Sequence, residues 1–269
     1  MKTLNNGQRI HMVDRKERHY ALTLKTGETF QHSGETIPHN ELIGKPDGTL
    51  VTLSRGQTML AINPTLGDYV VKMPRGAQIL YPKDLSTITM WADIYPGALV
   101  FESGCGSGAL TMTLLRAVGE NGHVISHEIR EDFLKTARNN INRYLGPVTN
   151  LSLVHNDVYK GIDEAEVDRV ILDLPEPWRV VPHAAKILRS GGIFLSFVPT
   201  VPQVATTVEA LGHEAIFTMI KTIEVLVRTW NVEGRSVRPD HRMVAHTGFI
   251  TIARRITPKE EKILRENCP

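Results

Sequence analysis

Hydrophobic and polar positions change their spacing near residue 75. Before this point, short apolar runs alternate with polar positions and are interrupted every few residues by glycine or proline, as around residues 20–24. Short alternating runs bounded by turn residues are typical of β-strands. The sequence therefore predicts a small β-rich N-terminal domain at residues 1–75, followed by a second domain at residues 76–269.

From residue 83 onward, continuous apolar runs alternate with longer segments in which the apolar residues have helical spacing. The first pattern indicates buried strands and the second indicates amphipathic helices. Strand–helix alternation favours an α/β fold with a mainly parallel sheet flanked by helices. The expected strands are 99–102, 123–128, 151–155, 169–174 and 193–198, and the expected helices are 84–95, 109–118, 131–145, 178–188 and 201–211, the last capped by Gly212.

The pattern changes again in the C-terminal part of the chain. Residues 222–230 alternate apolar and polar side chains, residues 249–253 form another apolar run, and the connection between them is polar and rich in Arg and His. We expect a β-hairpin with a long loop at the edge of the sheet. The charged segment 258–269 is expected to be a short helix or a frayed tail.

Composition limits the classes of function. The 31 Lys and Arg nearly balance the 29 Asp and Glu, so net charge alone indicates no nucleic-acid partner. The 11 His are scattered and no C-x-x-C occurs, so no metal site is predicted. Two cysteines are too few for a disulfide scaffold, and no segment is typical of a membrane span or a signal peptide. We expect a cytoplasmic protein without a membrane partner.

A glycine-rich turn joins the first expected strand of the α/β region to the helix that begins near Ala109. Residues 102–108 read Glu-Ser-Gly-Cys-Gly-Ser-Gly. Glycines let the backbone approach a ligand, and the free N–H groups of a helix N-terminus favour a negative group. The spacing differs from G-x-G-x-x-G and lacks a P-loop lysine, so a nucleoside or carboxylate fits better than a pyrophosphate. A turn that only packs on the sheet is the alternative.

Polar residues close the next two strands. Glu128 lies 128 − 108 = 20 residues after the last glycine, a distance at which an acid can hold ribose hydroxyls. Asn156 and Asp157 close the third strand, where a side chain can reach an adenine amino group. A surface glutamate and an Asx turn are the alternatives. Because ligands bind at the carboxyl ends of parallel strands, these residues together predict a nucleoside site.

Asp173 closes a further apolar strand and begins the segment Asp-Leu-Pro-Glu-Pro-Trp. Two prolines make this segment rigid, and acids at this edge of an α/β sheet are often functional. Asp173 is therefore a candidate catalytic acid, and Trp178 is a candidate for stacking a base. A structural cap and simple packing are the alternatives.

Basic residues gather near the C-terminus. Residues 221–255 contain seven Lys and Arg against three Asp and Glu, a local excess of 7 − 3 = +4. Such a segment fits contacts with RNA phosphates. A solvated surface with internal ion pairs is the alternative. The basic residues are Lys221, Arg228, Arg235, Arg238, Arg242, Arg254 and Arg255.

Several of these segments together resemble the tRNA (adenine-N1)-methyltransferase family. The resemblance rests on residues 102–111, Glu128, residues 172–178 and residues 238–249, and residues 79–84 (Ile-Leu-Tyr-Pro-Lys-Asp) strengthen it. It implies a seven-stranded class I methyltransferase sheet, S-adenosylmethionine as methyl donor, a homotetramer, and methylation of tRNA at N1 of adenine 58 in the T-loop. Some archaeal relatives also methylate adenine 57, and Tyr81 and Trp178 leave that choice open.

The resemblance also implies roles for individual residues. Asp173 and Tyr81 are the expected catalytic residues, with Asp173 as the catalytic acid at the target adenine and Tyr81 lining the base pocket. A methyltransferase acting on a protein or small molecule, or a non-catalytic RNA-binding module, is the alternative. The expected donor-binding residues are Ser103, Gly104, Cys105, Gly106, Ser107, Gly108, Ala109, Leu110, Glu128, Asp157 and Asp173, and the expected substrate-binding residues are Tyr81, Trp178, Arg238, Arg242 and His246.

Overall fold

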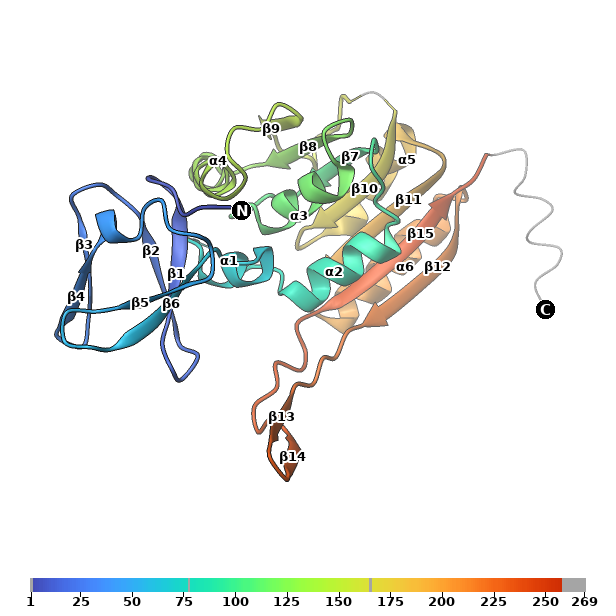
Figure 1. Cartoon of the computed structure of the whole chain (residues 1–269). Helices are drawn as coiled ribbons and strands as arrows, with labels where there is room; N and C mark the ends of the chain where they lie inside the picture. Colours follow the sequence, from blue (N-terminus) through green and yellow to red (C-terminus); the bar gives the residue numbers. More distant parts are fainter. Residues whose placement is uncertain (1, 77, 165, 258–269) are drawn as a thin grey trace. The chain divides into compact units, whose positions relative to one another are not determined.

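The computed structural model describes residues 2–76, 78–164 and 166–257 (Figure 1). Contacts divide the chain into two compact units. One unit comprises Met1–Met73 together with Asn140–Pro147, and the other comprises Pro74–Asn139 and Val148–Pro269. Among the helices of these described ranges, none combines the length and apolar character that a membrane span requires.

The first unit is β-rich, as the sequence predicts. Four antiparallel strands form a sheet in the order β2-β1-β6-β5, and β3 pairs with β4 in a separate hairpin. Ile10, Met12, Met59 and Ala61 contribute to its apolar core. The strands are β1 (Arg9–Val13), β2 (His19–Thr23), β3 (Thr29–His32), β4 (Glu35–Pro38), β5 (Thr49–Thr52) and β6 (Thr58–Ile62).

This unit also contains helix α1 (Leu66–Lys72), which the β-strand pattern did not indicate. The helix begins at a capping box, because the Thr65 hydroxyl accepts the Asp68 N–H and the Asp68 carboxylate accepts the Thr65 N–H, both at 3.1 Å. The end of helix α4 (Glu131–Leu145) belongs here as well, since the Tyr69 hydroxyl donates to the Asn140 carbonyl at 3.0 Å.

The second unit is built on a seven-stranded, mainly parallel sheet, which confirms the predicted fold class. The strand order is β12-β15-β11-β10-β7-β8-β9, and only β15 runs antiparallel to its neighbours. The strands are β7 (Leu99–Ser103), β8 (His123–Glu128), β9 (Leu151–His155), β10 (Val167–Asp173), β11 (Leu188–Val198), β12 (Phe217–Glu224) and β15 (Phe249–Arg255).

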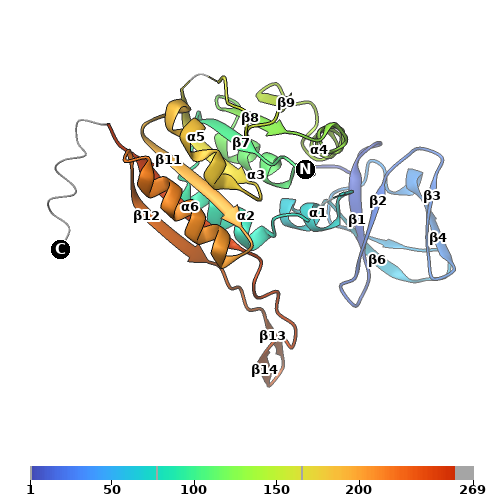
Figure 2. The same cartoon turned by 180° about the vertical axis from the view of Figure 1, so that it is seen from behind.

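Both faces of this sheet are covered by helices. Figures 1 and 2, taken together, show α2 (Pro82–Trp91) and α3 (Ala109–Val118) on one face, and α5 (Val181–Ile187) and α6 (Val201–His213) on the other. The central strands are therefore buried on both sides, which explains their continuous apolar runs: Val170, Ile171 and Leu172 are all fully buried.

The strand order reverses beside β7. The chain moves outward from β7 to β8 and β9 and then returns to place β10 on the other side of β7. Such a reversal leaves a crevice at the carboxyl ends of the two strands, where open α/β sheets bind ligands. The carboxyl ends of β7 and β10 are Ser103 and Asp173.

Several helix limits differ from the sequence-based prediction. Helix α2 covers Pro82–Trp91 rather than 84–95, and α6 continues through Gly212, which is therefore not its cap. The helix expected over 178–188 is a 3₁₀ turn, Pro177–Arg179, followed by the short α5. Leu188 leaves the helix because it pairs with Val167 at the start of β11.

The C-terminal prediction is confirmed in outline and corrected in detail. Strands β12 and β15 do pair antiparallel at the edge of the sheet, but β12 covers Phe217–Glu224 rather than the expected 222–230. Strand β12 ends at Glu224, and the connection carries a small ribbon formed by β13 (Trp230–Glu233) and β14 (Ser236–Pro239) (Figure 1). The segment 258–269, expected to be a helix or tail, lies outside the described residues.

Candidate active site

The glycine-rich turn lies between β7 and α3 and needs glycine at several positions. Gly104, Gly106 and Gly108 have φ of 93°, 52° and 87°, a region that residues with a Cβ rarely adopt. A Cβ on Gly104 would also lie 2.0 Å from the Asp173 carbonyl oxygen. The turn and the end of β10 are therefore in direct backbone contact.

Glu128, at the end of β8, is bonded to the same turn. Its Oε2 accepts the Gly106 N–H at 2.9 Å, and its Oε1 accepts the Arg130 N–H at 3.0 Å. The side chain is buried. The structure thus brings Gly104, Glu128 and Asp173 to one edge of the sheet, as expected for strand ends beside the reversal of strand order.

Three carboxylates gather at this edge, and two of them resist ionisation. Burial, and next the negative charge of Glu128, raises the pKa of Asp173 to about 7. Burial raises the pKa of Glu102 to about 7 as well, although the Thr111 hydroxyl donates to it at 2.8 Å. Buried groups that are held neutral in this way would be stabilised in their charged form by a nearby cation. The site therefore favours a positively charged ligand.

Cys105 lies within the glycine-rich turn but is not suited to nucleophilic chemistry. Burial raises the pKa of its thiol to about 12, so the thiol stays protonated at neutral pH. Its Sγ lies 3.6 Å from the Thr111 hydroxyl oxygen. The side chain of Cys105 is thus buried and contributes to packing.

The residues that follow β9 contact the end of β8 at Glu128. The Asn156 N–H donates to the Glu128 carbonyl at 3.2 Å. The Asp157 carboxylate accepts the Tyr159 N–H at 3.2 Å and lies 3.5 Å from the Lys160 ammonium. Asp157 therefore forms an Asx turn, and its half-buried side chain retains acceptor capacity.

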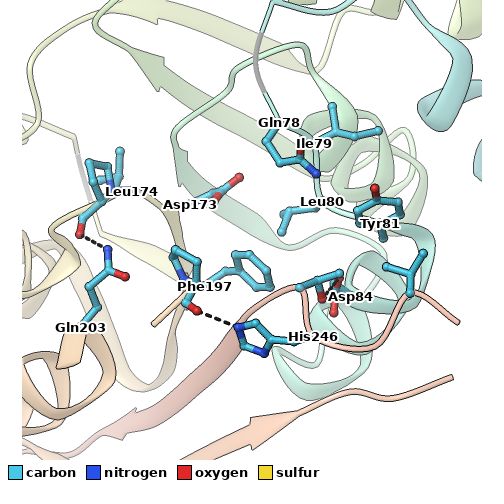
Figure 3. A pocket seen from close by; sticks show the side chains of 14 residues that line it. Gln78, Ile79, Leu80, Tyr81, Asp84, Asp173, Leu174, Phe197, Gln203 and His246 are labelled. Carbon is cyan, nitrogen blue, oxygen red and sulfur yellow. Dashed lines mark hydrogen bonds between the residues drawn. The ribbon is translucent and has the colours of Figure 1, made fainter. Parts of the chain in front are cut away.

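A cavity of about 530 Å³ opens beside Asp173 (Figure 3). Its walls come from four segments: residues 78–84, residues 173–175, residues 197–203 and residues 244–247. Tyr81 and Phe197 line it as aromatic rings, and the Asp173 carboxylate lines it as an acceptor. Aromatic rings with a few polar groups are typical of sites for flat heterocyclic ligands.

His246 contributes to the wall of this cavity and holds two strand ends together. Its Nε2 lies 2.8 Å from the Pro199 carbonyl oxygen (Figure 3), and its Nδ1 lies 2.8 Å from Glu224 Oε1. Both partners are acceptors, so the protonated ring, in which both nitrogens donate, satisfies both contacts. The Glu224 carboxylate and then the Pro199 carbonyl raise the pKa of His246 accordingly.

The other expected substrate residues lie elsewhere. Trp178 is half-buried in the 3₁₀ turn after β10 and is not among the residues that line the 530 Å³ cavity. Arg238 is exposed on β14, with Nη1 2.7 Å from His241 Nε2. Arg242 lines a smaller cavity of about 280 Å³, which shares Tyr81 and Val244 with the larger one.

Sequence reasoning missed several cavity residues. Phe197 carries no signal of its own, because it is one residue of an apolar strand. Gln203 on α6 donates to the Pro175 carbonyl at 2.8 Å and so holds the loop after Asp173. Asp84 and Thr247 lie within the segments that carry the family resemblance, but nothing in their spacing shows that they meet.

Within residues 2–76, 78–164 and 166–257, no group of three or more His, Cys, Asp or Glu side chains could hold a metal ion.

Known proteins resemble this chain over most of its length. A family model described as tRNA methyltransferase complex GCD14 subunit matches residues 58–243, and one described as TrmI-like N-terminal matches residues 3–51. A tRNA (adenine(57)-N(1)/adenine(58)-N(1))-methyltransferase TrmI from Methanocaldococcus jannaschii is 35% identical over 90% of this chain and 93% of its own. A tRNA (adenine(58)-N(1))-methyltransferase TrmI from Thermus thermophilus is 36% identical over 91% and 95%.

Two solved structures share both units of the fold. A protein from Thermotoga maritima described as a SAM-dependent O-methyltransferase is 33% identical, with a TM-score of 0.90 and 95% of each chain covered. The tRNA (m1A58) methyltransferase TrmI from Aquifex aeolicus is 26% identical, with a TM-score of 0.82 and 95% and 100% covered. Together with the family model and the relatives above, these likenesses mean that the chain belongs to the tRNA (adenine-N1)-methyltransferase family and is a methyltransferase.

Proposed function

We propose that this chain transfers a methyl group from S-adenosylmethionine to N1 of adenine 58 in tRNA, with adenine 57 as the second candidate position. The observation that carries the proposal is the backbone contact between Gly104 and Asp173. Because of it, a donor held by the glycine-rich turn would lie next to a base in the 530 Å³ cavity. The names of the relatives from M. jannaschii and T. thermophilus support the same substrate and position.

The residues at the strand ends fit the proposed donor. S-adenosylmethionine supplies, when bound, an electrophilic methyl group on a positively charged sulfonium. The carboxylates of buried Glu102 and half-buried Asp173, whose pKa values are raised to about 7, are complementary to such a cation. Glu128 would hold the ribose and Asp157 the adenine amino group, since each retains free acceptor lone pairs. The backbone of residues 103–110, Ser103 to Leu110, would hold the methionine part.

Asp173 is the proposed catalytic acid for the target base. A base paired in folded tRNA must be flipped out before its N1 is accessible, and a flipped base is held by aromatic stacking. Tyr81 lines the cavity and is suited to this contact, and Trp178 is a second stacking candidate. The Asp173 carboxylate would accept a hydrogen bond from the exocyclic amine, which raises electron density at N1 and stabilises the positive charge that develops there.

Basic side chains outside the cavity are proposed to bind the tRNA backbone. Arg238 lies on the exposed β13–β14 ribbon, Arg242 follows the ribbon and lines the 280 Å³ cavity, and His246 lies at the wall of the 530 Å³ cavity. Charged donors of this kind neutralise phosphates. We also propose that the enzyme works as a homotetramer in the cytoplasm, which chromatography with light scattering and cell fractionation would test.

A nucleoside digest tests the proposed reaction directly. Unmodified tRNA is incubated with the protein and donor, and mass spectrometry then measures 1-methyladenosine, while primer-extension arrest reports position 57 or 58. We expect 1-methyladenosine with wild type and almost none with Asp173→Ala, which should still bind donor in calorimetry. Asp173→Ala turnover near the wild-type rate would overturn the catalytic role of Asp173.

A different acceptor is the second candidate function. The T. maritima structure is described as an O-methyltransferase, and that name implies an oxygen acceptor rather than adenine N1. The same digest distinguishes the two, because an O-methyltransferase acting on a protein or small molecule would leave the adenines of the tRNA unmodified.

A further inference from the structure

A buried ion pair lies at the first turn of α2, directly after Tyr81. The Lys83 ammonium lies 2.8 Å from Asp84 Oδ1, and the two side chains are only 8% and 1% exposed. Tyr81 is the N-cap residue of the helix, so the backbone that carries its ring continues directly into the pair. Burying two charges is costly unless their remaining donors and acceptors are satisfied.

Hydrogen bonds to Thr247 and Val225 satisfy the remaining donors and acceptors of this ion pair. The Thr247 hydroxyl donates to Asp84 Oδ2 at 2.8 Å and accepts from the Lys83 ammonium. The ammonium also donates to the Val225 carbonyl at 2.8 Å. All three ammonium protons therefore have acceptors, namely Asp84, Thr247 and Val225. The cluster of Lys83, Asp84 and Thr247, called here the α2 cluster, joins two segments that are far apart in the sequence, and the bond from Lys83 to Val225 adds a third.

The segment that contains Thr247 is held on its other sides as well. His246 bonds to Glu224 and to the Pro199 carbonyl, both at 2.8 Å. A Cβ on the next residue, Gly248, would lie 2.3 Å from the Phe197 ring. The segment is therefore clamped between the start of α2 and the ends of β11 and β12. Asp84, Thr247, Tyr81 and Phe197 all line the 530 Å³ cavity.

Stability alone is a weak reason for such an arrangement. Buried ion pairs can often be replaced by apolar side chains of similar volume without loss of stability, whereas a fully bonded pair restricts the geometry of the segments that carry it. Here that geometry is the position of Tyr81 relative to the rest of the cavity wall. The cavity sits where the proposed function requires the target adenine.

We propose that the α2 cluster is a positioning device for the target base: it fixes Tyr81 and the adjoining wall so that the adenine is held in a reactive orientation. This inference rests on the proposed function. It concerns the rate of methyl transfer from the bound complex, because misorientation of bound reactants lowers turnover without necessarily weakening binding.

Replacement of Thr247 is the main test. Thr247→Val removes the hydroxyl at nearly constant shape, and Thr247→Ser retains it. The matched control is Thr222→Val, because the Thr222 hydroxyl bonds to Thr251 at 2.9 Å between β12 and β15, the strands joined by the connection that contains Thr247, but Thr222 does not line the cavity. We measure kcat and KM for tRNA, donor affinity and stoichiometry by calorimetry, and the melting temperature.

The expected result is a selective loss of turnover. Thr247→Val should lower kcat about tenfold, with donor affinity, donor stoichiometry and the KM for tRNA changed by less than about threefold. Thr247→Ser should recover most of kcat, and Thr222→Val should keep the wild-type kcat. A loss that is equal in Thr247→Val and Thr222→Val, or that follows the melting temperature alone, would mean a merely structural role and would overturn the proposal.

A double-mutant cycle tests whether the cluster acts through Tyr81. If it does, Thr247→Val should lower kcat much less in a Tyr81→Leu background than in wild type. Equal effects in both backgrounds would overturn the proposed route through Tyr81. Should Thr247→Val not fold, Lys83→Met/Asp84→Asn decides, since it removes both charges together: a folded double variant with wild-type kcat would overturn the proposal.

The wild-type control separates this inference from the function on which it rests. A wild-type protein that produces no 1-methyladenosine would overturn the proposed function. A wild-type protein that methylates tRNA, together with a Thr247→Val variant of unchanged kcat, would overturn only the role of the α2 cluster.

Discussion

Glu102 shows how burial changes the chemistry of a single residue. It lies near the end of β7, where a sequence indicates only an acid before a glycine-rich turn. In the fold it is fully buried, and the Thr111 hydroxyl lies 2.8 and 3.1 Å from its two oxygens. Burial outweighs these contacts and raises its pKa to about 7. Glu102 therefore binds more protons in the folded than in the unfolded chain between about pH 4.5 and 7.

This shift predicts how stability depends on pH. A carboxyl group whose pKa is higher in the folded than in the unfolded chain stabilises the fold fully at pH values below its pKa in the unfolded chain. This stabilisation is lost as pH rises through its pKa in the folded chain. The Gln side chain of Glu102→Gln does not titrate, so the variant does not lose this stabilisation as pH rises. Between pH 5 and pH 8 its free energy of unfolding should therefore fall by about 3 kcal/mol less than that of wild type. Urea unfolding at both pH values measures the difference. Parallel pH dependences in the two proteins would contradict the buried, protonated state of Glu102.

Asp173 predicts a pH dependence of activity. In the proposed reaction its ionised form is the stronger acceptor for the adenine amine and the form that stabilises the developing positive charge, and burial together with Glu128 raises its pKa to about 7. The kcat/KM for tRNA should therefore rise with pH across neutrality, and Asp173→Asn should lose this limb and about 100-fold or more of the rate. With donor saturating, its positive charge should move the midpoint of kcat to lower pH. A pH limb that persists in Asp173→Asn would assign the titration to another group.

At the scale of elements, the turn between β7 and α3 depends on its surroundings as much as on its own backbone. Gly104 and Gly106 both have positive φ, with values of 93° and 52°. Of these two glycines, only Gly104 has no room for a side chain. An added Cβ on Gly104 would lie 2.0 Å from the Asp173 carbonyl oxygen, whereas the nearest atom to an added Cβ on Gly106 is 3.9 Å away. The same residue type is thus needed for two different reasons.

This difference predicts unequal costs for two alanine substitutions. Gly106→Ala should destabilise the protein by about 1 kcal/mol, the cost of a left-handed backbone. Gly104→Ala should cost about 3 kcal/mol or more, because the turn or the end of β10 must also move. Chemical denaturation of both variants without ligand measures the two values. Similar costs would show that the contact between the turn and β10 is loose.

At the scale of the whole molecule, charge is distributed unevenly. The chain carries a net charge of only +2, yet residues 221–255 hold an excess of +4. In the structure this segment includes the exposed β13–β14 ribbon, which carries Arg238. The exposed cations on the ribbon or next to it, Arg235, Arg238 and Arg242, are suited to binding a polyanion at one place.

The salt dependence of tRNA affinity tests this arrangement. Arg238→Ala/Arg242→Ala should weaken tRNA binding and lower the slope of log affinity against log salt by about 2, since each phosphate contact contributes about 1. Donor affinity should not change. Arg116→Ala, at an exposed position on α3, is the control. An unchanged slope in the double variant would exclude these two arginines as phosphate contacts.

The sequence alone determined much of the fold because local spacing reflects which faces of an element are buried. The limits of α3, β8, α4 and β9 agree with those predicted from apolar periodicity. Predictions failed where pairing with a strand distant in the sequence decides where a helix or strand begins and ends. Leu188 is a strand residue because Val167 pairs with it, and β12 covers Phe217–Glu224 rather than 222–230 because these residues pair with β15.

For the site, the sequence supplied candidate residues at strand ends, and only the tertiary structure decided which of them meet. The contact of Gly104 with Asp173 and the bond between Thr247 and Asp84 depend on how the strands are ordered. The raised pKa values of Glu102 and Asp173 also belong to the folded state, because they arise chiefly from exclusion of water. Spacing along the chain carries no information on either quantity, since both depend on what surrounds a residue in three dimensions.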